Sequence, residues 1–263
     1  MRYGCLMAGV MLVSALCHAQ PGSKPMVRIC DDADEWPPYS YYIRKNHEKT
    51  PELTGYSVDV IKIILTKHAI PYTIELLPWK RCLAELETGD KYLMALSASE
   101  NPDRDKLFWF SDSYYKTHYY VFYSKDSHPD GVKVHGQADL NHYRLGGIKG
   151  YAYSSLTAVN KDNMVLTGDY VELVKMLHAG RFDVFAEDYE VLAGMSEVGS
   201  YDFMGDPKLG RMPLPGVPPN EYHMIFSRKN PQGLQLMTLV NKALESMRNS
   251  GELDRLLNLY VPK

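Results

Sequence analysis

Cysteine is scarce in this 263-residue chain, and its spacing matches no metal-binding or redox motif. None of the four cysteines forms a CxxC pair; they are Cys5, Cys17, Cys30 and Cys82. The histidines do not form a metal-binding motif either. Three of them recur every seven residues, at His128, His135 and His142, but they stand in loop sequence that contains proline and glycine. We therefore expect no bound metal and no cofactor.

An excess of charge of either sign is also lacking. The formal net charge is −3 at pH 7, so the chain has no basic footprint for nucleic acid. The segment GGIKG around Lys149 contains glycines, but it does not follow a phosphate-binding loop pattern. Nucleic acids and nucleotides are thus not expected as partners.

Long apolar runs are missing except at the N-terminus. Residues 6–16 are almost wholly apolar, follow a positive start at Arg2, and precede Cys17-His18-Ala19. This pattern predicts a signal peptide over residues 1–19 that is cut after Ala19. The alternative is a lipid anchor on Cys17, against which the bulky Leu16 argues. We expect export to the periplasm, where an oxidising environment leaves open whether Cys30 and Cys82 form a disulfide.

Strands and helices alternate in the first half of the chain. Apolar patterns predict strands at 26–30, 72–77 and 92–96, with helices over about 54–68 and 79–88. Between the first strand and the first helix, Pro37 and Pro38 exclude both helix and central strand. Trp36 is therefore expected on a rigid loop.

The alternation restarts after an aromatic strand at 119–123. Further strands are predicted at 143–148, 165–167, 183–186 and 222–227, with helices after Gly150, over 170–179 and in two segments of 231–260. Two restarts joined by two similar aromatic strands predict an α/β protein of two lobes hinged by two crossover strands. The predicted units are a discontinuous lobe 1, residues 26–121 with 223–263, and lobe 2, residues 122–222.

Several polar positions directly follow predicted strands. Ligands bind such sheets at the carboxyl ends of their strands, where Ser97, Ser99, Gly150 and Asp188 are expected. Arg104 stands nearby in a polar turn. Two interpretations of it remain: a solvated charge paired with a neighbouring aspartate, or a group that grips a ligand.

The chain resembles the family-3 extracellular solute-binding proteins, the periplasmic receptors for polar amino acids. The resemblance extends from Val27 to Tyr260. It rests on an ordered set of segments, each weak alone: WPPYSY, LTGYSVDV, PWKRCLAELETG, NPDR followed by FWFSDSYY, GGIKG, FDVFAED and SGELDRLLNLY. The family implies two α/β lobes around a ligand-binding cleft.

The resemblance also implies roles for single residues. Arg104 matches the arginine that holds the ligand α-carboxylate, and Asp188 matches the acid that takes the α-ammonium group. Hydroxyl donors and aromatic clasps of the family match four further residues: Ser97, Ser99, Trp36 and Trp79. An arginine suits the first role because its planar fork grips a carboxylate at two points.

Two departures from the family pattern concern the ligand. A serine or threonine is usual after the glycine of the second-lobe loop, but here Gly150 is followed by Tyr151 and an alanine. Backbone amides at a helix N-terminus, or Ser154, are expected to replace that donor, with Tyr151 beside the cleft. The usual acid of the first loop matches Ala33, which leaves Asp32 or Asp34 as replacements.

The function predicted from these features is capture of a small polar solute, in the first place an amino acid or related polar acid. We expect a monomer that delivers it to an inner-membrane ABC permease. One alternative is a secreted dehydratase of the cyclohexadienyl or arogenate type, for which Glu187 is the candidate general acid because burial next to Asp188 would raise its pKa. The other alternative is a stand-alone periplasmic sensor module.

Overall fold

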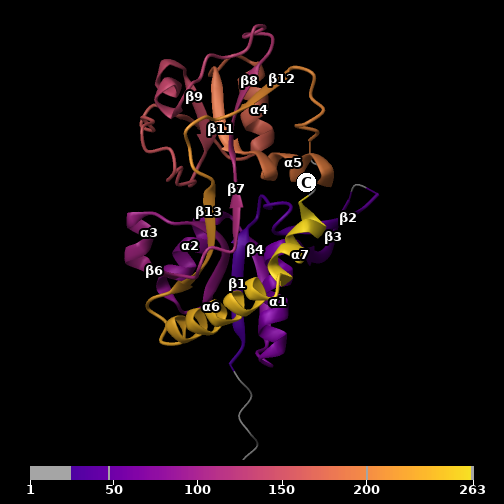
Figure 1. The fold of residues 1–263 in the computed structure, drawn as a ribbon, viewed down its shortest axis with the longest axis vertical. Helices are drawn as coiled ribbons and strands as arrows, with labels where there is room; N and C mark the ends of the chain where they lie inside the picture. Colours follow the sequence, from indigo (N-terminus) through magenta and orange to yellow (C-terminus); the bar gives the residue numbers. More distant parts are fainter. Residues whose placement is uncertain (1–24, 47, 200, 262–263) are drawn as a thin grey trace, which may run out of the picture.

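Two sheets, each with its own helices, are arranged end to end in a computed structural model of the chain (Figure 1). The structure describes residues 25–46, 48–199 and 201–261. The expected signal peptide with its cut after Ala19, and the alternative anchor at Cys17, lie outside the described residues. The two-lobe α/β architecture is as predicted.

Lobe 1 is built on a six-stranded sheet in the order β4-β1-β5-β13-β6, with β7 paired to β13. Its central strands β1, β4 and β5 run parallel, and β13 runs antiparallel to β5. The strands are β1 (Val27–Asp32), β4 (Tyr72–Leu77), β5 (Met94–Ser99), β6 (Phe108–Phe110), β7 (Tyr115–Thr117) and β13 (Asn220–Ser227). A hairpin of β2 (Tyr41–Lys45) and β3 (Glu48–Thr54) forms a separate two-stranded sheet.

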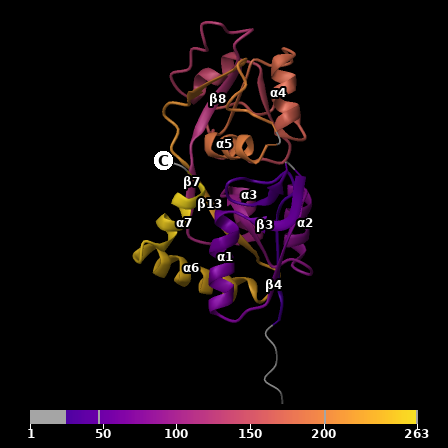
Figure 2. The same ribbon diagram turned by 90° about the vertical axis from the view of Figure 1, so that its right-hand side faces the viewer.

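Helices from both ends of the chain cover the lobe 1 sheet. They are α1 (Tyr56–Lys67), α2 (Trp79–Thr88), α3 (Pro102–Leu107), α6 (Gly233–Asn249) and α7 (Glu252–Tyr260). Figure 2 shows α6 and α7, in yellow, lying beside α1 although α6 begins 166 residues after α1 ends. The chain therefore leaves lobe 1, builds lobe 2 and returns.

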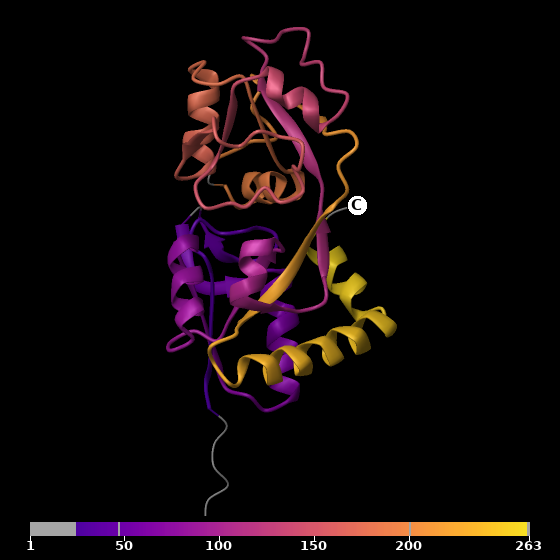
Figure 3. The same ribbon diagram turned by 90° about the vertical axis from the view of Figure 1, so that its left-hand side faces the viewer.

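Lobe 2 has a five-stranded sheet in the order β10-β9-β11-β8-β12. The strands are β8 (Tyr119–Ser124), β9 (Leu145–Ile148), β10 (Val165–Thr167), β11 (Val184–Asp188) and β12 (Leu209–Pro213). The helices are the 3₁₀ helix η1 (Gln137–His142), α4 (Tyr170–His178) and α5 (Tyr189–Val198). Figure 3 shows α5 on the side of lobe 2 that is turned toward lobe 1.

The chain passes between the sheets twice. The first passage follows β7, because β8 pairs within the lobe 2 sheet from Tyr119 onward. The second precedes β13, which pairs within the lobe 1 sheet from Asn220 onward. The expected boundaries fell within the aromatic strands, at 121/122 and 222/223. Each of these strands instead belongs wholly to one sheet, so both passages lie a few residues earlier in the chain.

Local sequence signals explain where helix α2 begins and ends. Pro78 precedes its first residue and Gly89 ends it in the left-handed conformation, at φ 72°. Its inner face buries Trp79, Cys82 and Leu86. Cys82 forms a disulfide with Cys30 of β1, with 5.8 Å between the Cα atoms, so the helix is tied to the central sheet. The pairing that the sequence left open is thus present.

Two local predictions were wrong. No helix follows Gly150: residues 151–163 form turns and irregular chain, and Tyr153 adopts a left-handed φ of 47° that interrupts a helix. Arg104 lies in the short helix α3 rather than in a turn. The Asn101 side chain accepts hydrogen bonds from the backbone N–H groups of Asp103 and Arg104, and Pro102 occupies the first helical position.

Candidate functional site

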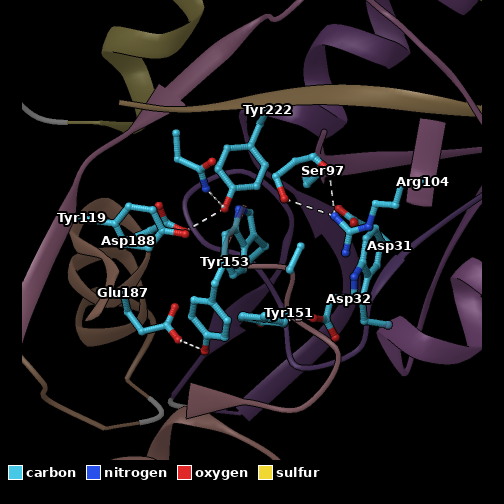
Figure 4. Close-up of a pocket in the computed structure, with 15 residues that line it drawn as sticks. Asp31, Asp32, Ser97, Arg104, Tyr119, Tyr151, Tyr153, Glu187, Asp188 and Tyr222 are labelled. Carbon is cyan, nitrogen blue, oxygen red and sulfur yellow. Dashed lines mark hydrogen bonds between the residues drawn. The ribbon is translucent and has the colours of Figure 1, made fainter. Parts of the chain in front are cut away.

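A pocket lies where the two lobes face each other (Figure 4). Seven of the eight residues expected to bind a ligand line it: Trp36, Trp79, Ser97, Ser99, Arg104, Tyr151 and Asp188. The exception is Gly150, whose two successors along the chain line the pocket instead. Eight further residues complete the wall: Asp31, Asp32, Tyr119, Ala152, Tyr153, Glu187, Asn220 and Tyr222.

Arg104 supplies the pocket's cationic group. Its side chain is buried, with 8% of the residue exposed, and Nη1 donates to the carbonyl oxygen of Ser99 at 2.8 Å and to Ser99 Oγ at 3.1 Å. The guanidinium lies 5.5 Å from the centre of the Trp79 ring. Burial lowers the pKa of Arg104, although an arginine stays charged in proteins.

No carboxylate of the described chain pairs with Arg104. The ion pairs within residues 25–46, 48–199 and 201–261 all involve other cations. A buried, unpaired guanidinium is costly unless an anion compensates it. The remaining N–H donors of Arg104 are therefore suited to an anionic ligand group.

Asp188 lies on the opposite lobe, at the end of β11. It occupies the N-cap position of α5 but makes no side-chain cap bond there. Instead Oδ1 accepts from the Thr117 hydroxyl and Oδ2 accepts from the Tyr222 hydroxyl at 2.7 Å. Both donors belong to the strands that join the lobes. Burial raises the pKa of Asp188 to about 6, and these two hydrogen bonds partly offset that rise.

Stacked tyrosines support the hinge beneath the pocket. Tyr39, Tyr115 and Tyr222 form a column with ring centres 3.8 Å and 4.9 Å apart. Trp36 donates from Nε1 to the Tyr115 hydroxyl at 3.1 Å and is 5% exposed. The double proline that displays Trp36 therefore places it in the wall of the pocket and against the hinge.

Two adjacent carboxyl groups, Asp31 and Asp32, end strand β1. Ser40 Oγ donates to Asp31 Oδ2 at 2.6 Å, and Asp32 Oδ1 accepts from the backbone N–H of Asp34 at 3.1 Å. Burial raises the pKa of Asp31 to about 6 and that of Asp32 to about 7. Asp32 was one of the two residues expected to replace the first-loop acid, and it is the one that reaches the pocket.

Glu187, next to Asp188, is satisfied within lobe 2. Its carboxyl group accepts hydrogen bonds from the hydroxyls of Tyr153 and Tyr170, the second at 3.1 Å. Burial raises its pKa to about 8, with the charge of Asp188 adding to the rise, so Glu187 is largely protonated at pH 7.

Further contacts across the pocket join the two lobes. Tyr151 of lobe 2 donates to Asp32 Oδ2 at 3.3 Å, and its ring meets that of Trp36 edge-on with centres 5.6 Å apart. On a second face, Gly194 of α5 packs directly on the backbone of Pro37 and Pro38. The lobes are therefore in a closed arrangement.

Sequence reasoning missed several residues of the wall, namely Asp31, Tyr119, Tyr153, Asn220 and Tyr222. Tyr119 and Tyr222 were assigned to aromatic strands, but nothing in a strand pattern tells which face meets the other lobe. Tyr153 was missed because a helix, rather than a loop, was predicted after Gly150. Because no helix forms there, its backbone amides are not at a helix N-terminus, and the tyrosines of that loop enter the pocket instead.

Within the described part of the chain, no group of three or more histidine, cysteine or acidic side chains is placed to hold a metal ion. Among the same residues no helix is both long enough and apolar enough to cross a bilayer.

The sequence from residue 27 to residue 263 matches the model of a protein family described as bacterial extracellular solute-binding proteins, family 3. This chain belongs to that family. A curated relative in Neisseria gonorrhoeae is named "Probable histidine-binding protein"; it is 23% identical over 255 residues, covering 93% of this chain and 87% of the relative.

Solved structures of an amino acid-binding protein and of a sensor domain show the same fold. The amino acid ABC transporter substrate-binding protein AbpA of Streptococcus pneumoniae, bound to L-arginine, matches with a TM-score of 0.70 at 20% identity, covering 89% of this chain and 93% of AbpA. A histidine kinase sensor domain with similarity to periplasmic binding proteins matches with a TM-score of 0.72 at 17% identity, covering 91% and 97%. At such identities the likeness concerns the fold alone.

Proposed function

We propose that this family-3 protein captures a free amino acid between its lobes. The ligand carboxylate would bind the guanidinium of Arg104 in lobe 1, and the ligand ammonium group would bind Asp188 in lobe 2. The observation that carries this proposal is the buried guanidinium without a carboxylate partner, facing a buried carboxylate across a closed cleft.

Opposite charges on opposite lobes suit a zwitterion. An α-amino acid compensates both buried charges only when the lobes are closed, so it binds the closed arrangement better than the open one. A ligand shifts a conformational equilibrium by this difference in affinity. Closure around the ligand would then present one lobe arrangement to a partner protein.

The proposed setting rests on the N-terminal sequence and on the family. We propose that the leader is removed after Ala19, that the protein is a periplasmic monomer, and that it delivers its ligand to an inner-membrane ABC permease. A sensor role is the alternative for the same closure, and the fold of the sensor-domain neighbour is compatible with it.

The test is a thermal-shift screen of residues 20–263 against the proteinogenic amino acids and small organic acids, followed by calorimetry of the hits. A ligand at 100 times its dissociation constant adds about 2.7 kcal/mol to the free energy of unfolding, which is readily measured. Replacing Arg104 with alanine is expected to weaken binding about 10- to 150-fold, because a hydrogen bond to a charged group contributes roughly 1.5–3 kcal/mol.

Lys106→Ala is the matched control. Lys106 lies on the same helix, with 72% of its side chain exposed in an ion pair with Asp103, and does not line the pocket. It should leave the affinity unchanged. Amino acids that bind equally well to wild type and Arg104→Ala would contradict the proposal.

A dehydratase is the second candidate, since protonated Glu187 lines the pocket and is the kind of group that acts as a general acid. Its carboxyl group is held in place by hydrogen bonds with the hydroxyls of Tyr153 and Tyr170. Turnover of a cyclohexadienyl acid that is lost in Glu187→Gln would establish the enzyme instead of the binding protein.

A further inference from the structure

One residue beside the pocket has a backbone conformation that residues other than glycine rarely adopt. Glu35 has a φ of 66°, in the left-handed region. It stands between Asp34 and Trp36, in the segment that follows β1. Such conformations cost free energy, persist only where the surrounding structure fixes them, and gather at functional sites. Other groups of the protein must therefore hold Glu35 in place.

The hairpin of β2 and β3 provides those groups. The Glu35 side chain is buried, and its Oε1 accepts from the backbone N–H of Tyr42 at 2.7 Å. Arg44 donates at two points, from Nη1 to Oε1 at 2.7 Å and from Nη2 to Oε2 at 2.5 Å, which is the geometry of a strong ion pair. Lys49 Nζ lies 2.9 Å from Oε2. Burial alone would raise the pKa of Glu35, but these donors outweigh it and lower the pKa, so the carboxylate is charged at neutral pH.

The segment of residues 32–38, here called the closure segment, is a surface of lobe 1 on which lobe 2 closes. Tyr151 of lobe 2 contacts it twice, through the carboxyl group of Asp32 and through the ring of Trp36. Gly194 of α5 packs directly on the backbone of its two adjacent prolines. These contacts lie on both sides of the strained residue in sequence. The strained residue is thus at the centre of a surface that the closed arrangement needs.

The hairpin anchor, Glu35 with Arg44 and Lys49, also lies at the junction of the lobes. All three residues line a recess whose other side is formed by residues of α4 and α5 in lobe 2. Figure 1 shows β2 and β3 at the end of lobe 1 that is nearest to lobe 2. Glu35 does not line the ligand pocket itself. Any effect of Glu35 on a ligand must therefore pass through the segment that it holds.

We propose that Glu35 is a positioning residue for ligand capture: through the hairpin anchor it holds the closure segment in the conformation on which lobe 2 closes. The inference rests on the proposed function, because it assumes that ligand binding and closure are coupled. Molecules whose closure segment has relaxed do not close, so the apparent affinity falls in proportion to the fraction that remains competent. Loss of the anchor should then weaken every ligand of the cleft by the same factor.

Two substitutions of Glu35 separate the ion pair from the backbone conformation. Both remove the carboxylate, but glycine adopts a φ of 66° without strain, whereas alanine does not. Glu35→Ala should relax the closure segment and weaken binding about 5- to 150-fold, the equilibrium shift that corresponds to strain of this kind. Glu35→Gly should bind more tightly than Glu35→Ala. Calorimetry with L-arginine, L-histidine and any other hit of the screen measures these affinities, and the loss should be equal for all of them.

Arg44→Gln removes the other half of the ion pair. It should weaken binding in the same direction as Glu35→Ala. The double variant should lose no more than the larger single loss, because side chains that act as one unit are not additive. Lys45→Gln is the matched control, since Lys45 is the next residue of β2, is exposed and carries the same charge. It should leave the affinity unchanged.

Hydrogen exchange measures the state of the closure segment without any ligand. The backbone N–H of Trp36 donates to the carbonyl oxygen of Ser40 at 2.7 Å, so exchange at this amide reports whether the segment keeps its conformation. In ligand-free Glu35→Ala the amides of residues 33–40 should exchange faster than in the wild type, while those of residues 27–31 should not change. Lys45→Gln should exchange like the wild type.

Three outcomes would overturn the inference. Unchanged exchange in Glu35→Ala would mean that the hairpin anchor does not hold the segment, and a loss that differs between amino acids would mean that Glu35 meets the ligand. Equal affinities of Glu35→Ala and the wild type, with dependence on Arg104 retained, would refute the positioning role and leave the proposed function standing. If the wild type binds no amino acid, the proposed function fails, and hydrogen exchange alone decides whether Glu35 positions the closure segment.

Discussion

Replacing Gly194 with alanine adds a methyl group where helix α5 of lobe 2 meets lobe 1. A Cβ atom at this position would lie 2.7 Å from the carbonyl carbon of Pro37, 2.8 Å from its oxygen and 2.9 Å from the nitrogen of Pro38. All three are backbone atoms, which cannot rotate away as a flexible side chain does. The closed arrangement must therefore shift, whereas an open arrangement has room.

The magnitude follows from the cost of overpacking, about 1–3 kcal/mol. At 1.4 kcal/mol per factor of ten, the equilibrium between closed and open forms should move about 5- to 140-fold toward the open form. Helix propensity acts in the opposite direction on global stability, since alanine is better than glycine in a helix interior by about 0.8–1 kcal/mol in both forms. The melting temperature without ligand should thus stay the same or rise while affinity for the ligand falls.

Small-angle scattering and calorimetry measure the two halves of this prediction. The radius of gyration of the ligand-bound Gly194→Ala protein should exceed that of the wild type, or closure should require more ligand. Gly136→Ala is the control, because nothing lies within 4 Å of a Cβ atom there and its φ is not positive. An unchanged affinity would refute the closure role of this contact, and a large loss of melting temperature would mean that the lobes never separate at α5.

Two other predictions concern stability. A Cys30→Ala/Cys82→Ala double variant lacks the disulfide, which joins residues 52 positions apart. Its loss should lower the free energy of unfolding by about 4 kcal/mol and the melting temperature by roughly 8–16 °C. Wild type reduced with dithiothreitol should show the same decrease, and an unchanged melting temperature would contradict the presence of the bond. Burial raises the pKa of Glu187 from 4.5 to about 8, so its contribution to stability is complete below about pH 4.5 and is lost as the pH rises to about 8. In melting curves from pH 5 to 8, Glu187→Gln should flatten this decline and exposed Glu197→Gln should not; equal slopes in both variants would refute the assignment.

Local signals account for the elements that sequence reasoning predicted well. Pro78 and Gly89 bracket α2, and the apolar alternation of residues 72–77 predicts β4 because a strand with one buried face repeats every two residues. Short elements were harder. Helix α3 has an N-cap asparagine and a proline at its first position, but six residues carry too little periodicity to reveal a helix.

After Gly150 the error was the reverse, because a helix was predicted where the chain forms a loop. The glycine and the serines of GYAYSSL are typical of a turn into a helix, yet tertiary contacts decide the conformation. The Tyr153 hydroxyl accepts from the backbone N–H of Ile148 at 2.7 Å and donates to Glu187, which holds the loop back against its own sheet. The contact with Glu187 joins positions 34 residues apart, so it leaves no local pattern in the sequence.

Residue types and their order were enough to predict a two-lobe α/β protein and seven of the residues that line the pocket, because strand ends, capping residues and family motifs are local properties. The balance of charge in the cleft was not accessible in that way. Whether Arg104 is paired, whether Asp188 caps a helix or bonds to the hinge, and whether Asp32 or Asp34 reaches the pocket all depend on which side chains meet across the sheets. Burial and partners set these properties, and both arise only when the two lobes fold and close.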